Sequence, residues 1–144
     1  MTTFKNFSAL LLFFSMVFLI YSPAINGDFV WDDDLHLTDN KQLESVEGLK
    51  NIWLKLGATV QYYPLTFTSF WFEKRLWGNN PTGYHIINLL LHASSAIILW
   101  RILIMLAIPG AFLAALIFLV HPVNVESVAW ITERKNTLSG LFYF

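Results

Sequence analysis

The chain has 144 residues, of which 56% are hydrophobic, 17% aromatic and only 13% charged. Soluble domains carry about 25% charged residues, so this composition excludes an ordinary water-exposed globule and predicts an integral membrane protein. A net charge of −1 offers no basic surface for nucleic acid, and the absence of cysteine excludes disulfides and thiolate chemistry.

Residues 7–26 are predicted to form the first transmembrane helix, after a cytoplasmic N-terminus at residues 1–6. The run from Phe7 to Ile25 has no charged side chain, and a helical span needs about 20 residues. A cleaved signal peptide is the alternative, because Ser22-Pro23-Ala24 is similar to a small-x-small cleavage site. The apolar run is longer than a typical signal core, so we expect a retained anchor.

Residues 27–83 are predicted to form a large external loop that carries most of the charge, with eight of the ten acidic and five of the nine basic residues. Lys5 and Arg101 flank the first and second predicted spans, which favours a cytoplasmic location for both flanks and an external one for the loop.

Two helices are predicted inside the loop. Apolar spacing between Val46 and Leu56 gives one amphipathic face, and Gly57 follows as a stop signal. Pro64 suits the first turn of a second, aromatic-rich helix that runs to Trp77 and ends at Gly78. Aromatic side chains gather at the membrane interface, so we expect both helices to lie on the bilayer surface.

The remaining residues predict further spans. Residues 84–107 are predicted to form the second helix, with a turn at Pro109-Gly110 after it. The third helix, at residues 108–122, is expected either to extend past Pro122 or to be embedded shallowly. Residues 123–137 predict an external loop or helix, and residues 138–144 the start of a fourth span. The fold class is therefore all-α, with polytopic membrane helices and interfacial helices in the first external loop.

The second predicted span has a polar face. His85, Asn88, His92 and Ser95 recur at spacings of three and four, which places them on one side of a helix. Such groups either join helices to one another or line a wet cavity. A zinc site is not expected, because Asn is a poor ligand and no HExxH pattern occurs.

Two clusters of charge predict chemistry. Asp32 and Asp33 lie in a run of three adjacent carboxylates, which raise one another's pKa and suit a general base. Arg134 and Lys135 lie beside a predicted membrane boundary and suit a lipid phosphate. If Asn124 caps a helix, Glu126 falls in its first turn.

The motifs resemble the transmembrane and tetratricopeptide-repeat O-mannosyltransferase family, in particular its bacterial-type relatives. The resemblance is carried, in the order of the family, by the blocks Phe29–Asp34, Tyr62–Thr66, Trp77–Pro81, Gly83–His92 and His121–Ser139. It implies a GT-C type glycosyltransferase that takes a sugar from a polyprenyl-phosphate donor and passes it to an acceptor, in particular a protein, outside the cytoplasm.

The resemblance also implies roles for particular residues. Asp32 and Asp33 occupy the acidic motif, and one of them would be the general base. Arg134 and Lys135 would compensate the leaving phosphate, with Glu126, His92 and His121 as further substrate-binding candidates. No cofactor or resident metal is expected, although the acids could hold a divalent cation such as Mg²⁺ or Mn²⁺. The partners implied are the bilayer, the lipid-linked sugar and the acceptor, and the location is the bacterial inner membrane in preference to the endoplasmic reticulum.

The family has many more helices than this chain predicts, so we expect a truncated, N-terminal piece that is inactive in isolation. A non-catalytic membrane scaffold, whose tetratricopeptide repeats would bind partner proteins, is the alternative function. A transporter that uses the polar face from His85 to His92 as a path is a third.

Overall fold

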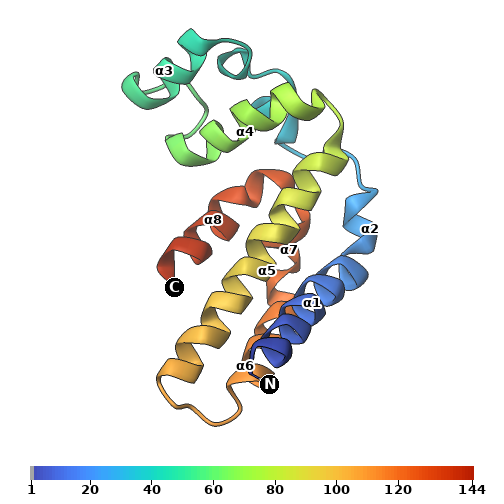
Figure 1. Ribbon diagram of the computed structural model, residues 1–144. Helices are drawn as coiled ribbons and strands as arrows, with labels where there is room; N and C mark the ends of the chain where they lie inside the picture. The colour runs from blue at the N-terminus through green and yellow to red at the C-terminus, as the bar shows by residue number, and fades with distance from the viewer. Residues whose placement is uncertain (1) are drawn as a thin grey trace.

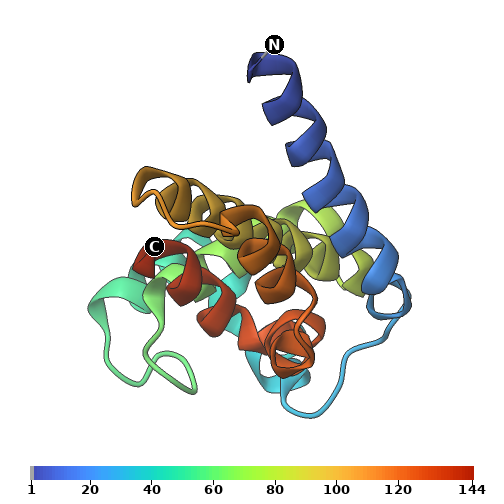
Figure 2. The same ribbon diagram turned by 90° about the horizontal axis from the view of Figure 1, so that it is seen from below.

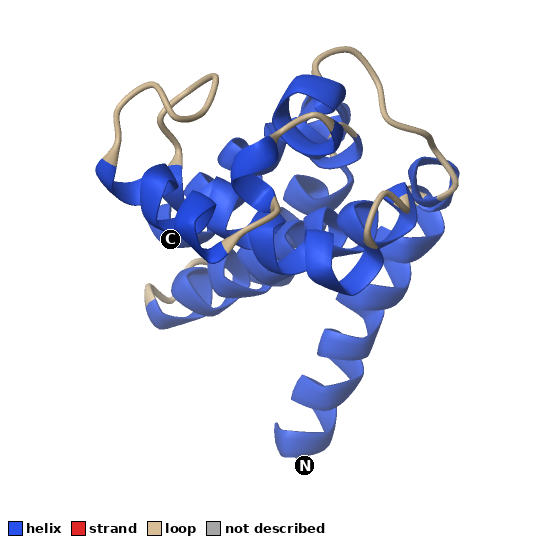
Figure 3. Cartoon of the chain, turned by 90° about the horizontal axis from the view of Figure 1, so that it is seen from above, coloured by secondary structure: helices blue, strands red, loops and turns tan. Residues whose placement is uncertain are grey.

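The computed structural model describes residues 2–144 and is all-helical, with no strand within that range (Figure 3). The α-helices are α1 Thr2–Ile20, α2 Ser22–Ile25, α3 Val46–Leu54, α4 Pro64–Trp77, α5 Pro81–Met105, α6 Ala111–Val120, α7 Val125–Ala129 and α8 Arg134–Tyr143. Short segments of 3₁₀ or π geometry lie at Asp34–Thr38, Lys41–Leu43, Pro122–Asn124 and Ile131–Glu133.

Helix α5 is the central element of the fold. It contacts α1, α2, α4, α6, α7 and α8, and Figure 1 shows these helices arranged around it. Phe13 and Val17 of α1 pack with Leu89 of α5 and Leu119 of α6 in a core without solvent exposure. The N-terminal part of α1 projects away from the other helices (Figure 2).

The segment between α2 and α5 builds a second core at one end of the helices (Figure 1). Phe67 and Phe70 of α4 are buried there against Tyr84 of α5 and Ile131. The expectation that the aromatic side chains of α4 belong to the membrane surface is thus wrong for these two, because they fill the core of the loop itself. The predicted bounds of α4 are confirmed, including Gly78 with a positive φ of 60° as its C-cap.

Of the described residues, one helix is long and apolar enough to cross a membrane, namely α5. Helices α6 and α7 are long and apolar enough only when they are taken together, and a bend of 47° lies between them. The predicted span 7–26 is interrupted, because α1 ends at Ile20. Its apolar part, Phe7–Ile20, is shorter than a helix that crosses a membrane. The structure therefore supports one membrane helix and leaves the multi-pass arrangement a prediction.

Glu126 lies in the first turn of α7, as expected, but Asn124 does not cap that helix. The Asn124 side-chain amide donates instead to the Phe118 carbonyl at 2.8 Å, in the last turn of α6. Helix α7 ends at Ala129, and a 3₁₀ turn intervenes before α8. Glu126 and Glu133 consequently lie on different elements.

Candidate functional site

Asp33 is a buried carboxylate at the end of the loop that follows α2. Its Oδ2 accepts a hydrogen bond from the Val30 N–H at 2.9 Å, and its Oδ1 accepts one from the Thr132 N–H at 3.0 Å. Its side chain has no solvent exposure. Because both oxygens are bound by backbone donors, Asp33 ties the loop to the turn before α8.

Asp32 is the accessible partner of Asp33. Its side chain is 42% exposed, and its Oδ1 accepts a hydrogen bond from the Thr132 hydroxyl at 3.1 Å. The Oδ2 atom lies 3.4 Å from His36 Nε2. The His36 ring in turn stacks on Phe67 with 5.6 Å between the ring centres. The carboxylate is therefore oriented by two neighbours but remains open to a reactant.

The local environment sets different protonation behaviour for Asp33 and His36. Burial raises the pKa of Asp33, although the hydrogen bonds from Val30 and Thr132 oppose that rise. Burial also lowers the pKa of His36 from 6.5, with the nearby charge of Asp32 acting in the other direction. A neutral His36 can still donate one N–H to Asp32, because a neutral imidazole keeps one donor.

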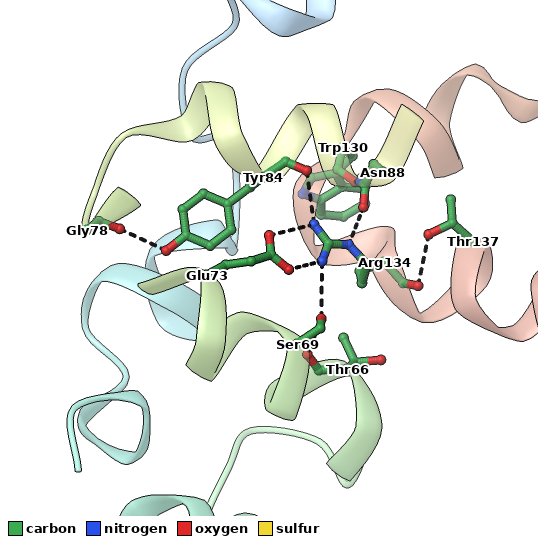
Figure 4. A network of polar contacts seen from close by, with 9 residues as sticks. All are labelled: Thr66, Ser69, Glu73, Gly78, Tyr84, Asn88, Trp130, Arg134 and Thr137. Atoms are coloured by element: carbon green, nitrogen blue, oxygen red, sulfur yellow. Dashed lines mark hydrogen bonds and ion pairs between the residues drawn. The ribbon is translucent and has the colours of Figure 1, made fainter. Parts of the chain in front are cut away.

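Arg134 is fully buried at the start of α8, where all five of its N–H donors bond to the protein (Figure 4). Its Nε donates to the side-chain oxygen of Asn88, and its two Nη atoms bind both carboxylate oxygens of Glu73. The remaining donors reach the Ser69 hydroxyl at 3.1 Å and the Tyr84 carbonyl at 2.9 Å.

This arrangement corrects the expectation that Arg134 binds a lipid phosphate. A guanidinium that uses every donor inside the protein and has no exposed surface cannot contact a phosphate without breaking the network. The network instead joins α4, α5 and α8 (Figure 4). Because Thr132 lies two residues before Arg134, the network also fixes the turn that holds Asp32 and Asp33.

Lys135, the residue after Arg134, remains partly accessible and lines a cavity. Its ammonium is 2.7 Å from Glu133 Oε1 and 5.9 Å from the centre of the Tyr63 ring. It lines a cavity of about 410 Å³ together with Tyr62, Tyr63 and Ser139. Its charge is close enough to lower the pKa of His36, so Lys135 and the Asp32–His36 pair share one electrostatic neighbourhood.

The other predicted site residues are not brought to Asp32. Glu126 is exposed and lines a separate cavity beside Trp31. His92 is buried, and its Nε2 lies 2.9 Å from the Leu119 carbonyl. His121 is exposed, and its Nδ1 accepts a hydrogen bond from the Val123 N–H.

The polar face of α5 is buried, as its spacing predicts. His85, Asn88, His92 and Ser95 are each at most 4% exposed. Asn88 donates to the Trp130 carbonyl at 3.0 Å, and His92 bonds to α6, so these two residues join helices. This evidence supports the helix-contact interpretation over a polar path.

The acids do not converge on a cation. Both oxygens of Asp33 are bound by backbone N–H groups, and Asp34 Oδ1 accepts from Thr38 at 3.0 Å. Across residues 2–144, His, Asp and Glu side chains form no group of three or more that could hold a metal. The residues present therefore do not fit the divalent cation that the motif would allow.

Three residues of the site were missed by the sequence analysis. Thr132 carries no sequence signal, because a lone Thr between Ile131 and Glu133 has no distinctive spacing. His36 lies four residues after Asp32, which could have indicated a pair. Glu73 is the one acid of α4, and its place within an aromatic helix could have indicated a buried partner.

Comparison with known proteins gives one consistent group of relatives. The chain is 32% identical to mouse protein O-mannosyl-transferase TMTC4 over 87% of its length, and 32% identical to Drosophila melanogaster protein O-mannosyl-transferase Tmtc3 over 85%. It is 30% identical to human protein O-mannosyl-transferase TMTC2 over 86%. No protein-family model matches the chain, and no solved structure matches it significantly.

The matched regions are a small part of the relatives, since the chain spans 20%, 17% and 16% of their respective lengths. The alignments nevertheless include 85–87% of this chain. Homologues at about 30% identity are protein O-mannosyl-transferases of the TMTC group, which supports the family resemblance carried by the motifs.

Proposed function

We propose that this chain supplies the catalytic loop of a membrane glycosyltransferase of GT-C type, which transfers a mannosyl group from a polyprenyl-phosphate donor to a hydroxyl of a protein acceptor. The names of its relatives and its apolar helix α5 support this proposal. The observation that carries it is the pair of carboxylates held on Thr132, one exposed and one buried.

In this proposal Asp32 is the general base and Asp33 is a positioning residue. Asp32 takes the proton from the acceptor hydroxyl, whose oxygen forms a bond to the anomeric carbon of the donor. The bond from that carbon to the phosphate oxygen breaks, and the phosphate keeps the electron pair. A placed general base contributes about 10²–10⁴-fold to such a step.

Lys135 is the proposed cation for the leaving phosphate. Its ammonium lines a cavity whose walls also include Leu65, Leu138 and Phe142, which suits a phosphate attached to a hydrocarbon chain. Its ion pair with Glu133 would have to exchange for the phosphate. Arg134 is given no contact with the substrate and serves to place the turn around Thr132.

The proposal includes a location. Residues 27–83 lie outside the cytoplasm of a multi-pass protein, in particular at a bacterial inner membrane. An alternating pattern of external and internal reporter fusions around α5 would support this topology. A fusion at Gly57 that reports the cytoplasm would place Asp32 on the wrong side for an extracytoplasmic acceptor.

The direct experiment measures mannosyl transfer from polyprenyl-phosphate mannose to an acceptor peptide, with the protein in its natural membrane. Asp32→Asn should lower the rate by about 10²-fold or more, because it removes the base. Asp34→Asn is the matched control, since Asp34 is an exposed neighbour whose carboxylate accepts a hydrogen bond from Thr38 of its own turn. Transfer that survives Asp32→Asn would exclude this mechanism and favour the non-catalytic scaffold.

A further inference from the structure

A second cavity, of about 610 Å³, is separate from the Lys135 cavity, and its lining includes none of Asp32, Asp33 and Thr132. Its polar and aromatic walls come from Asp28 and Trp31 in the loop, His85 at the start of α5, Glu126 in α7 and Trp130. The volume falls within the range of about 300–1,000 Å³ that is usual for small-molecule sites.

The two indole rings form a large aromatic surface at this cavity. Trp31 is 78% exposed and meets the Trp130 ring edge to face, with 4.6 Å between the ring centres. The backbone of Trp31 has a φ of 53°, in the left-handed region that a bulky residue rarely adopts. Strain of this kind gathers at functional sites.

Two residues of the walls, His85 and Trp130, carry ring nitrogens that are enclosed by the protein. His85 is 3% exposed, and neither of its ring nitrogens has a well-aligned partner among the described residues, although the backbones of Gly27 and Ala129 flank the ring. The Nε1–H of Trp130 is also buried without a partner in that part of the chain. Because buried polar groups are normally paired, the unpaired Trp130 N–H points to an occupant of this cavity, whereas His85 is already contacted by the backbones of Gly27 and Ala129.

The remaining polar walls are carboxylates. Asp28 and Glu126 are both exposed, and Asp28 Oδ1 already accepts a hydrogen bond from the Phe29 N–H at 2.8 Å. An ionised carboxylate only accepts hydrogen bonds, whereas an indole N–H only donates. The cavity therefore presents strong acceptors and a donor to the same occupant.

We infer that this cavity binds a sugar ring. A hydroxyl group both donates and accepts, so it can satisfy Asp28 and Glu126 while also pairing with the Trp130 N–H. An ammonium ligand would leave that N–H unpaired, and an anion would be repelled by the two carboxylates. The apolar C–H face of the ring would lie on the indole of Trp31, which offers a large rigid contact area.

The sugar can come from either of two sources. A smaller apolar cavity of about 300 Å³ shares Ala24, Val125 and Ala129 with this one and extends to Ile20 at the end of α1. That continuity would admit a sugar that is attached to a lipid. A free or protein-linked glycan would use the sugar cavity alone.

Saturation-transfer NMR on the whole protein in lipid nanodiscs tests the inference, with methyl α-mannopyranoside as the probe. The choice of mannose rests on the proposed function, but binding itself does not require transfer. We expect saturable binding that Trp31→Ala and Glu126→Gln each weaken at least about tenfold. Both residues are exposed, so these variants should fold.

Matched control variants show whether a loss of binding is specific to this cavity. Trp53→Ala and Glu47→Gln remove an exposed indole and an exposed carboxylate on α3, and neither should change binding. Choline and inorganic phosphate should give no saturable signal at the cavity. Binding of choline that Glu126→Gln abolishes would overturn the sugar assignment in favour of a cation.

A second arm identifies the source by loading nanodiscs with polyprenyl-phosphate mannose and measuring protection of Trp31 from oxidation. Protection by the lipid-linked sugar alone assigns a lipid-linked source, whereas competition by the free glycoside assigns a soluble one. Absence of an effect from both probes would overturn the inference. Asp32→Asn should abolish transfer and keep sugar binding, so failure of the catalytic proposal and failure of this inference give different results.

Discussion

The backbone N–H of Thr132 donates to Asp33 Oδ1 at 3.0 Å, although the two residues are 99 positions apart in the chain. The Thr132 hydroxyl makes a second bond, to Asp32, at 3.1 Å. One residue of the turn before α8 therefore orients both acids of the external loop. The loop and the turn form one site only because α4, α5 and α8 are held together beneath them.

Removing the Thr132 hydroxyl tests this relationship. Thr132→Val keeps the shape and the backbone bond to Asp33 but loses the bond to Asp32, which should lower stability by about 0.5–1.5 kcal/mol. We expect the transfer rate to fall about tenfold, equivalent to about 1.4 kcal/mol of barrier, because Asp32 loses its orientation. Thr132→Ser is the control, and equal rates for both variants would contradict the positioning role.

The buried ion pair of Arg134 with Glu73 should dominate local stability. Arg134→Met leaves the Glu73 carboxylate buried and unpaired, which should lower the free energy of unfolding by about 3–5 kcal/mol. Thermal unfolding in detergent would measure the loss. Lys50→Met breaks an exposed pair with Glu47 and should change stability by about 0–1 kcal/mol.

A combined variant separates the ion pair from packing. Replacing both partners, in Arg134→Met with Glu73→Leu, should recover part of the stability that Arg134→Met loses, since no buried charge remains. No recovery would mean that the lost bonds to Asn88 and Ser69 matter more than the unpaired carboxylate.

His36 should make stability depend on pH. Burial lowers its folded-state pKa below 6.5, so the unfolded chain binds the proton more tightly. The contribution of His36 is therefore fully present above about pH 6.5 and is lost as pH falls through the lower, folded-state pKa. The difference in unfolding free energy between the wild type and His36→Asn should shrink over that window, and a constant difference would contradict the assignment.

The strained backbone of Trp31 should be visible in the stability of variants at this position. Trp31→Gly and Trp31→Ala both remove the indole and its contact with Trp130, but only glycine adopts a φ of 53° without a steric penalty. Trp31→Gly should therefore be more stable than Trp31→Ala by about 1 kcal/mol, as measured by denaturant unfolding. Equal stability would mean that the loop relaxes around residue 31 in the variants.

The local signals in the sequence were reliable where one physical effect dominated. Pro64 and Gly78 bound α4 as predicted, because proline favours a first helical turn and glycine accepts a positive φ. The polar spacing from His85 to Ser95 correctly indicated one buried face of α5. The same kind of reasoning placed Glu126 correctly in the first turn of α7 but failed for Asn124, whose side chain bonds to the Phe118 carbonyl instead of capping that helix.

The sequence by itself determined the helical class, the apolar central helix and the acidic motif, because helix signals and hydropathy depend on near neighbours along the chain. The tertiary structure alone decided which acid is accessible and that Arg134 is buried in a network with Glu73 and Asn88. Those properties depend on contacts between residues 46 to 100 positions apart, and no local pattern records which partners a folded chain brings together.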